Sequence, residues 1–341
     1  MPDAHPALDA FLERLPARTH HGRALPLRVG TRGSPLALTQ TRLFLSLLGR
    51  FCPVLAPGLG QDQVFQQHVI RTTGDKVQDR RLSDIGGKGL FSKEIHEALL
   101  DRRIDFAVHS LKDLETELPP GIVLACTLRR EDARDVLVLG PTCGAPGASP
   151  FDALPAGAVI GTNSVRRQAQ LLHARPDLRM ALLRGNVQPR LAKVARGECD
   201  ASLLALAGLR RLGLEQDATL LPLDPALMVP SAGQGIVGIT IRADDSSLRD
   251  LLAGIEDPEA RAVSTAERAL LASLDGSCLT PIGGYARLLP GGALHLTGLV
   301  ARADGTFLLK RTMQGAATDA ARIGTELGDS LRQDSPADIF G

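Results

Sequence analysis

The stretch LRVGTRGSPLAL, residues 27–38, carries the pattern on which the fold prediction depends. Its first five residues alternate between apolar and polar side chains, as the residues of a β-strand do. Ser34 and Pro35 then supply a helix N-cap and a first-turn proline. The helix that follows is predicted to present one apolar face, made by Leu36, Leu43 and Leu47. This stretch therefore predicts a strand, a tight loop and a helix.

The same alternation of strand and helix recurs further along the chain. Residues 91–100 form a helical pattern before an apolar strand at 104–108, and a strand at 158–160 leads through a Ser164 cap into another helix. A further apolar strand is predicted at 180–183. Strands that alternate with helices are typical of parallel sheets with helices packed on their faces.

The pattern changes after residue 258. A predicted helix at 258–274 is followed by three antiparallel-looking strands, near 285–289, 294–300 and 306–312, and then by a final helix. Runs of neighbouring strands followed by a helix indicate a small α+β domain at the end of the chain.

Composition limits the classes of function. The 341 residues, 44% of them hydrophobic, suffice for two or three domains at roughly 100 to 200 residues each. No apolar run approaches the roughly 18 residues that cross a bilayer. The formal net charge of +1 gives no general attraction for nucleic acid or an acidic membrane surface. We therefore expect a protein that binds neither and whose function depends on local sites.

The cysteines, the histidines and the N-terminus give three further expectations. The five cysteines include no Cys-x-x-Cys pair, which suits a reducing cytoplasm. The eight histidines show neither zinc nor metalloprotease spacing, so we predict no metal site. The N-terminus lacks the basic-then-apolar order of a signal peptide, and residues 1–26 are predicted to be a flexible tail.

Arginine dominates the basic residues, since only six of the 39 are lysine. Codon bias alone would explain the total, and single arginines or helix-capping serines are common without any ligand. Several arginines nevertheless follow predicted strands, where parallel sheets bind ligands, and a guanidinium can hold a carboxylate by two parallel hydrogen bonds. Those at strand ends or in the helices that follow are Arg32, Arg166, Arg167, Arg184, Arg190 and Arg211.

The run GGKG at residues 86–89 resembles a phosphate loop only superficially. A glycine follows Lys88 where a P-loop has Ser or Thr, and the glycine spacing of a P-loop is absent. No Gly-x-Gly-x-x-Gly follows a predicted strand either. The sequence therefore gives no support for a nucleotide or dinucleotide cofactor.

Six short motifs occur in a specific order. They are TRGSPLAL at 31–38, GGKGLF at 86–91, HSLKD at 109–113, RRQ at 166–168, RGNV at 184–187 and GQG at 233–235. Together with the run Gly276-Ser277-Cys278, this ordered set strongly resembles the porphobilinogen deaminase family. The resemblance covers roughly residues 28–289 and fades over the last 50 or so residues.

The resemblance implies two periplasmic-binding-protein-like α/β lobes plus a smaller C-terminal α+β domain. The first lobe would comprise residues 27–130 and 234–254, and would carry the catalytic aspartate and a returning strand near 236–241. The second, arginine-rich lobe would comprise residues 131–233, and the third domain, residues 255–341, would carry the cofactor-attachment cysteine.

The resemblance also implies a transferase of tetrapyrrole and heme biosynthesis, hydroxymethylbilane synthase. It would condense four porphobilinogen molecules, releasing ammonia each time, onto a dipyrromethane cofactor attached covalently by a thioether to Cys278. Asp113 would be the catalytic group, because loss of ammonia leaves an azafulvenium cation that a carboxylate can stabilise. We expect a cytoplasmic monomer whose partner is this small-molecule substrate.

The remaining site residues are carried over from the same motifs. Each pyrrole ring bears an acetate and a propionate, and a charge-assisted hydrogen bond to a carboxylate is worth about 1.5 to 3 kcal/mol. The expected cofactor-binding residues are Ser110, Lys112, Thr162, Ser164, Arg166, Arg167 and Arg184. The expected substrate-binding residues are Arg32, Ser34, Lys88, Arg190, Arg211 and Gln234.

The chain departs from the family pattern at four positions. Ser277 stands where the family has Gly, Asn163 where it has Ser, Val165 where it has Leu, and Glu115 where it has Pro. No reacting group is lost, but Glu115 adds a negative charge close to the catalytic position. Two alternatives stay open at this point: a non-catalytic two-lobed anion receptor, because fold does not fix function, and an inactive homologue.

Overall fold

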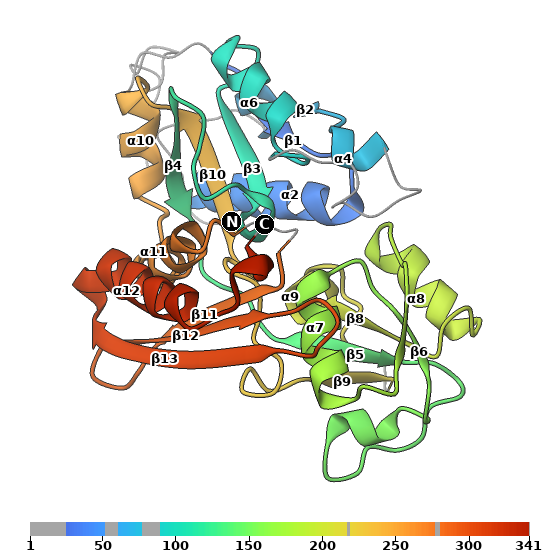
Figure 1. Ribbon diagram of the computed structural model, residues 1–341. Helices are drawn as coiled ribbons and strands as arrows, with labels where there is room; N and C mark the ends of the chain where they lie inside the picture. Colours follow the sequence, from blue (N-terminus) through green and yellow to red (C-terminus); the bar gives the residue numbers. More distant parts are fainter. Residues whose placement is uncertain (1–24, 52–60, 77–88, 217–218, 277–279, 341) are drawn as a thin grey trace.

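The computed structural model describes residues 25–51, 61–76, 89–216, 219–276 and 280–340. Figure 1 shows three bodies, each built on its own sheet. The sheets have the strand orders β2-β1-β3-β10-β4, β7-β6-β8-β5-β9 and β11-β12-β13. Two α/β lobes and a smaller C-terminal α+β domain are therefore present, which confirms the predicted fold class.

The first lobe begins with the strand predicted from the opening motif. Its strands are β1 (Leu27–Thr31), β2 (Phe65–Val69), β3 (Phe106–Ser110), β4 (Ile122–Thr127) and β10 (Val237–Arg242). Its helices are α2 (Pro35–Phe51), α3 (Gln61–Val64), α4 (Thr73–Lys76), α6 (Lys93–Leu100) and α10 (Ser246–Ala253), with a 3₁₀ turn, η2, at Leu111–Asp113. The Ser34 hydroxyl accepts a hydrogen bond from the amide of Ala37 (3.2 Å), so it caps α2 as expected.

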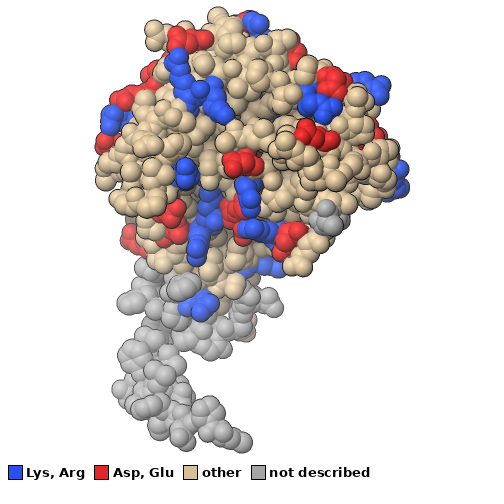
Figure 2. All heavy atoms as spheres, turned by 90° about the horizontal axis from the view of Figure 1, so that it is seen from below, with Lys and Arg blue, Asp and Glu red and all other residues tan. Residues whose placement is uncertain are grey.

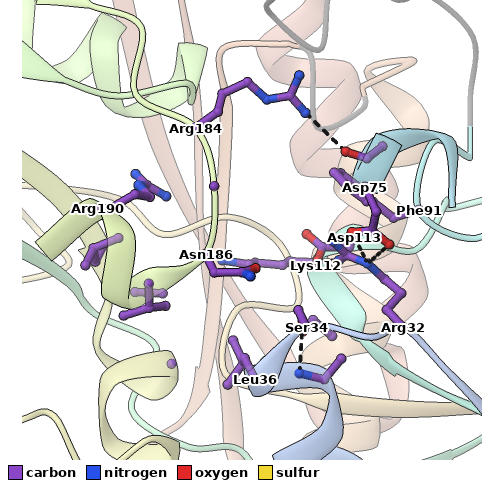
Figure 3. Close-up of a pocket in the computed structure, with 18 of the residues that line it drawn as sticks. Arg32, Ser34, Leu36, Asp75, Phe91, Lys112, Asp113, Arg184, Asn186 and Arg190 are labelled. Atoms are coloured by element: carbon purple, nitrogen blue, oxygen red, sulfur yellow. Dashed lines mark hydrogen bonds and ion pairs between the residues drawn. The ribbon is translucent and has the colours of Figure 1, made fainter. Parts of the chain in front are cut away.

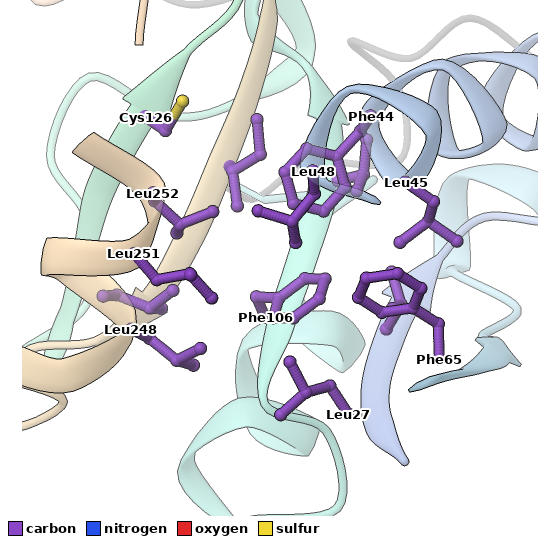
Figure 4. Close-up of a cluster of buried hydrophobic side chains, with 14 of the residues drawn as sticks. Leu27, Phe44, Leu45, Leu48, Phe65, Phe106, Cys126, Leu248, Leu251 and Leu252 are labelled. Carbon is purple, nitrogen blue, oxygen red and sulfur yellow. The ribbon is translucent and has the colours of Figure 1, made fainter. Parts of the chain in front are cut away.

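The core of the first lobe fixes α2 against the sheet (Figure 4). Phe44 meets Phe106 of β3 edge to face, with 5.2 Å between ring centroids, a favourable geometry for aromatic pairs. Leu48 is also fully buried, whereas Leu43 is 41% exposed. The predicted apolar face of α2 was therefore wrong at Leu43, because the helix turns Phe44 and Leu48, one turn apart, toward the sheet, whereas Leu47 packs against this core as predicted.

Strand β10 returns from the second lobe and inserts between β3 and β4. It runs antiparallel to both neighbours, while β1 is parallel to β2 and β3. The predicted return of a strand near 236–241 to the first lobe is confirmed. The prediction of parallel sheets is confirmed for β1, β2 and β3 but not for β10, because a strand that comes back from the other lobe enters the sheet from the opposite end.

The second lobe repeats this mixed arrangement. Its strands are β5 (Asp135–Leu139), β6 (Val159–Gly161), β7 (Arg179–Ala181), β8 (Ala201–Ala205) and β9 (Leu220–Pro222), and its helices are η3 (Pro150–Ala153), α7 (Val165–Ala174), α8 (Val187–Ala195) and α9 (Leu206–Arg211). Strand β6 is parallel to β7 and β8, whereas β5 is antiparallel to β8 and β9. The carboxyl ends of three parallel strands therefore share one edge of this sheet.

The C-terminal domain packs two helices on one face of an antiparallel sheet (Figure 1). Its elements are α11 (Pro258–Ser273), β11 (Ile282–Leu288), β12 (Ala293–Ala301), β13 (Leu308–Ala316), η4 (Ala317–Asp319), α12 (Ala320–Gln333) and η5 (Ala337–Ile339). Gly324 lets the helices approach closely, because a Cβ there would lie 2.2 Å from the carbonyl oxygen of Ala266. The predicted helix, three strands and final helix are confirmed.

The C-terminal domain contacts both lobes. The fully buried Glu267 of α11 accepts a hydrogen bond from Arg130 (2.6 Å), which lies where the chain crosses between the lobes. The turn between β12 and β13 rests on α7, where Nδ1 of His173 hydrogen-bonds the carbonyl of Gly305 (3.0 Å). The domain therefore bridges the two lobes.

The molecular surface carries both signs of charge. On the face in Figure 2, Lys and Arg are interspersed with Asp and Glu rather than gathered into one basic surface. This distribution agrees with a net charge of only +1. Among the residues described, no helix combines the length and apolar character needed to cross a membrane.

Candidate active site

The carboxyl ends of the parallel strands in the two lobes face one another across a cavity of about 290 Å³ (Figure 3). From the first lobe, β1 leads to Arg32 and β3 leads to Lys112 and Asp113. From the second lobe, β7 leads to Arg184 and α8 presents Arg190. A second cavity of about 160 Å³ shares Lys112, Asp113 and Arg190 in its lining. This is the edge at which open α/β sheets bind ligands.

Arg32 organises the first-lobe wall of the cavity. Its guanidinium pairs with Asp75 (2.6 Å) and, at 3.5 Å, with Asp113. The same guanidinium lies over the ring of Phe91, with 4.2 Å from Cζ to the ring centroid, as in a cation–π contact. Burial raises the pKa of Asp75, but hydrogen bonds from Arg32 and its charge outweigh burial and hold that pKa below its usual range.

Asp113 is the carboxylate that this arrangement leaves available. Its side chain is 29% exposed and makes one long contact with Arg32, whereas Asp75 is held by three hydrogen bonds from Arg32. The short 3₁₀ turn that follows β3 places Asp113 beside Lys112 at the mouth of both cavities. Asp113 can therefore approach a positively charged or proton-donating group of a ligand.

Lys112 connects the 3₁₀ turn η2 to the crossover between the lobes. Its Nζ donates to Oε1 of Gln234 (3.4 Å), and the Nε2 of Gln234 donates to Oδ1 of Asp135 (2.8 Å). Burial lowers the pKa of Lys112 to about 8; the Asp113 carboxylate opposes this effect and Arg167 adds to it. Lys112 is therefore charged at neutral pH and loses its charge in mildly alkaline solution.

Arg166 and Arg167 are held in the second lobe by a buried aspartate. Asp135 is 0% exposed and accepts hydrogen bonds from Arg166 (2.7 Å) and Arg167 (2.8 and 3.1 Å). Burial raises the pKa of Asp135, but the charges of the two arginines outweigh it and the net shift is strongly downward. Ser164 caps the same helix by accepting from the amide of Arg167 (3.4 Å). The arginine pair is therefore oriented before any ligand binds.

Two buried polar atoms in the cavity walls have no hydrogen-bond partner among the described residues. They are Oδ1 of Asn163 and Nε of Arg190, although Nη2 of Arg190 donates to the Leu203 carbonyl (3.2 Å). Burial lowers the pKa of Arg190 to about 10, and the charge of Arg167 adds to the effect. An unsatisfied buried polar group costs about 1 to 3 kcal/mol, so both atoms indicate a ligand that offers a donor and an anionic acceptor.

The charge of the larger cavity supports an anionic ligand. Its described lining has five basic side chains, Arg32, Lys112, Arg167, Arg184 and Arg190, against two carboxylates, Asp75 and Asp113. Arg184 reaches across from the second lobe, and its Nη2 donates to the Gly74 carbonyl of the first (3.4 Å). The basic excess is therefore local to the cavity.

His109 and Ser110 of the HSLKD motif each form a hydrogen bond with another side chain of the first lobe. His109 is buried, and its Nε2 hydrogen-bonds Oγ1 of Thr240 (2.9 Å). Burial, with further effects of His96 and Arg32, lowers the pKa of His109 to about 3, so the ring is neutral at neutral pH. Ser110 donates to Oε1 of Gln40 (3.0 Å) on α2. Both residues border the cavity, but their contacts hold β3 in place.

The structure gathers most of the predicted site residues and leaves a few elsewhere. The larger cavity is lined by Arg32, Ser34, Ser110, Lys112, Asp113, Arg167, Arg184 and Arg190, and the smaller one adds Ser164, Arg166 and Gln234. Neither lining includes Thr162, whose hydroxyl accepts from the Ser164 amide (3.2 Å), or Arg211, which donates to the Gly235 carbonyl (2.7 Å). Lys88 and Cys278 lie outside the described residues.

Sequence reasoning missed three side chains that shape this site. Asp75 and Phe91 hold Arg32, and Asp135 holds the arginine pair. Asp75 gave no signal, and Phe91, although it ends the GGKGLF motif, gave no sign of a contact with Arg32, because each is far from Arg32 in the chain. Asp135 did give one, since a charged residue directly precedes the apolar run Val136–Leu139 at the start of a buried strand.

Two family models match the chain. One is described as porphobilinogen deaminase, dipyromethane cofactor binding domain, and matches residues 27–250. The other is described as porphobilinogen deaminase, C-terminal domain, and matches residues 262–333. The expectation that the resemblance fades after residue 289 was therefore wrong, because the C-terminal domain lacks short charged motifs but keeps a matching pattern.

Relatives from two bacteria agree with these models. A protein named porphobilinogen deaminase from Nitrobacter winogradskyi is 47% identical over 312 residues, covering 92% of this chain and 94% of the relative. One of the same name from Paracoccus denitrificans is 47% identical over 315 residues, covering 92% and 96%. Among solved structures, a probable amino-acid ABC transporter extracellular-binding protein from Bacillus subtilis is 11% identical, with a TM-score of 0.41, covering 68% and 90%.

Proposed function

The chain belongs to the porphobilinogen deaminase family, and from this premise we propose that Asp113 is its catalytic carboxylate and that Cys278 carries its cofactor. The activity is that of hydroxymethylbilane synthase, a transferase of tetrapyrrole biosynthesis that condenses four porphobilinogen molecules with release of ammonia. Its cofactor is dipyrromethane. A non-catalytic anion receptor is not favoured, because the relatives share this enzyme's name over nearly the whole chain.

The residues around the two cavities fit a dipyrromethane. Each of its pyrrole rings offers an N–H donor and two carboxylates. The unpartnered Oδ1 of Asn163 can accept a hydrogen bond, and the unpartnered Nε of Arg190 can donate one. We propose that Lys112, Ser164, Arg166, Arg167 and Arg184 hold the cofactor, together with Ser110 at the cavity wall and Thr162 behind the capping loop. When bound, the cofactor supplies the carbon that accepts the incoming pyrrole.

Asp113 is proposed to act on the incoming porphobilinogen. Loss of ammonia from its aminomethyl group leaves a cation, and a carboxylate at hydrogen-bond distance stabilises that charge more effectively than water does. Asp113 is suited to this task because it is partly exposed at the junction of the two cavities and carries only one long contact with Arg32. The same carboxylate can take up and release the protons that substitution on the pyrrole ring requires.

The substrate's carboxylates need cations that stay in place through each step. We propose Arg32 and Arg190 for this role, with the Gln234 amide and Ser34, at the N-terminus of α2, as neutral hydrogen-bond donors. Lys88 is proposed as well and lies outside the described residues. Arg211 is proposed as a more distant contributor, since its Nη2 holds the Gly235 carbonyl next to Gln234.

Attachment at Cys278 is supported by its neighbours in the chain. Cys278 itself lies outside the described residues, but Thr280 lines the smaller cavity with Arg166 and Gln234. Cys278 is two residues from Thr280 in the sequence, and this closeness along the chain is what supports the attachment. A thiolate is a soft nucleophile suited to forming a thioether once in the life of the enzyme.

The division of the chain is proposed along the same lines. Residues 27–130 and 234–254 would be the catalytic lobe, 131–233 the arginine-rich lobe, and 255–341 the cofactor-attachment domain. The boundaries at 130 and 234 are supported by Arg130, whose Nε donates to the Gln234 carbonyl (2.8 Å), since the outgoing and returning chains meet there.

We further propose a cytoplasmic monomer. Three cysteines of the described chain, Cys126, Cys143 and Cys199, are free thiols, which suits a reducing compartment. The exposed large hydrophobic residues of the described chain are few and come from separate elements, which gives no sign of a broad apolar interface.

Intact-protein mass spectrometry tests the attachment site. The purified protein should carry a mass increment equal to a dipyrromethane, and Cys278→Ala should lack it. Cys143→Ala is the matched control, because Cys143 is a partly exposed free thiol of the second lobe, and it should keep the increment. Protein of unmodified mass, or an increment that survives in Cys278→Ala, would contradict the proposal.

A further inference from the structure

An arginine of the C-terminal domain holds the segment directly after Asp113 by hydrogen bonds to its backbone. Arg268 of α11 donates from Nη2 to the carbonyls of Glu115 (2.6 Å) and Thr116 (3.0 Å). Its Nη1 donates to the carbonyl of Leu114 (3.3 Å). One guanidinium therefore satisfies three consecutive backbone acceptors, which a lysine ammonium could not match with the same rigid geometry.

The first lobe also holds this segment, through a hydrogen bond to the side chain of Glu115. Oε1 of Glu115 accepts a hydrogen bond from the hydroxyl of Ser92 (2.7 Å), at the N-terminus of α6. The fit is close, because a Cβ at Gly89, whose φ is +80°, would lie 2.2 Å from the same oxygen. Glu115, which stands where the family pattern has Pro, therefore directs its carboxylate toward α6 and not toward Asp113.

Helix α11 carries Arg268 and comes shortly before Cys278, the proposed cofactor-attachment residue, in the sequence. It ends at Ser273, five residues before Cys278, and Arg268 lies in its last two turns. Burial lowers the pKa of Arg268 to about 10, with the Glu115 carboxylate opposing that effect, so the guanidinium stays charged across the neutral range. Arg268 therefore joins the last two turns of α11 to the backbone at residues 114–116.

We propose that Arg268 is a positioning residue that ties α11 to the catalytic turn and so fixes Asp113 relative to the segment that carries Cys278. The inference rests on the proposed catalytic role of Asp113. Arg268 contacts the backbone beside the reacting group and acts through it. A displacement of a catalytic group by about 1 Å can reduce turnover on the order of 100-fold. The hydrogen bonds from Arg268 should therefore affect the rate of turnover.

The test compares two arginines of the same helix. Arg261, two turns earlier on α11, donates from both Nη atoms to the Leu124 carbonyl of β4 (3.3 Å each) and pairs with Glu256. It too joins α11 to the first lobe, but away from the catalytic turn. Arg268→Lys should lower kcat by roughly 10- to 100-fold and change KM by less than about twofold, because the binding arginines are untouched. Arg261→Lys should leave kcat near that of the parent.

Hydrogen–deuterium exchange provides a readout that does not depend on activity. Peptides covering residues 111–118 should exchange faster in Arg268→Lys and at the parent rate in Arg261→Lys, because only the first loses the grip on this segment. If Arg268→Lys does not fold, Arg268→Gln, which keeps one donor for the carbonyls, is measured in its place. Parent values of both kcat and exchange in a folded Arg268 variant would overturn the proposal, as would equal losses of kcat in the Arg261 and Arg268 variants.

Different results would overturn the catalytic role of Asp113 and the positioning role of Arg268. Near-normal turnover in Asp113→Asn would remove the catalytic role of Asp113 itself. An inactive Asp113→Asn together with an unaffected Arg268→Lys would leave that role standing and overturn only the positioning role.

Discussion

Replacement of Asp135 by Asn should destabilise the second lobe strongly. Asp135 is fully buried and accepts hydrogen bonds from Arg166, Arg167 and Gln234. The substitution leaves the shape unchanged but removes the only carboxylate that contacts both buried guanidinium groups among the described residues. Breaking a buried ion pair by removing one partner costs about 3 to 5 kcal/mol, and here two cations lose their partner.

Differential scanning calorimetry at neutral pH measures this cost. At about 4 to 8 °C per kcal/mol for a lobe of roughly 100 residues, the transition of the second lobe should move down by at least about 10 °C. The matched control is Asp177→Asn, because Asp177 is an exposed carboxylate that pairs with Arg175; its transition should stay close to the parent temperature. A shift of less than about 2 °C in Asp135→Asn would refute the reasoning that Asp135 holds the arginine pair.

The loss of stability in Asp135→Asn should also depend on pH in a defined direction. The pKa of Asp135 is lowered in the folded protein, so its contribution to stability is present above the unfolded pKa, about 3.9, and is lost as pH falls through the lower folded value. The difference between Asp135→Asn and the parent should therefore be constant from about pH 5 to 8 and shrink in stronger acid. A difference that grew on acidification would contradict the assignment.

Three further predictions concern the cavity. Lys112, proposed above to hold the cofactor, loses its charge through a pKa of about 8, so turnover should fall above that pH in the parent and stay flatter in Lys112→Arg; parallel profiles would rule out Lys112 as the cause. Arg184 lies at the cavity and bridges to Gly74, so Arg184→Leu should accumulate partly elongated complexes in intact-mass spectra, and an unchanged distribution would count against its role. The pKa of His109 is about 3, so its ring signals in NMR should not titrate between about pH 5 and 8; a titration there would show that the ring is less buried than the structure has it.

The local pattern of the chain predicted the strand β1, the Ser34 cap and the C-terminal α+β domain, because each depends on neighbouring residues. It did not predict that β10 runs antiparallel between β3 and β4, since that depends on a chain that leaves and re-enters the first lobe. The buried face of α2 was misjudged by one residue, Leu43 for Phe44, because both are apolar and only the position of the sheet decides between them.

The candidate site shows the same division between local and long-range information. Motifs identified Arg32, Asp113 and the arginine pair, which the structure brings to the same two cavities. The residues that hold them come from distant parts of the chain, and no motif linked them to the residues that they hold. Asp135 lies 31 residues from Arg166, and Arg268 lies 153 residues from Glu115. Such partners can be identified only once the fold is known.

The catalytic role of Asp113 is tested most directly by single-turnover kinetics of Asp113→Asn loaded with its cofactor, as verified by intact mass. Asn keeps the size of the side chain but removes the charge that stabilises the cation and the site that carries the proton. We predict that porphobilinogen still binds and that ammonia release slows by about 100-fold or more. Release at a rate near that of the parent would contradict the account.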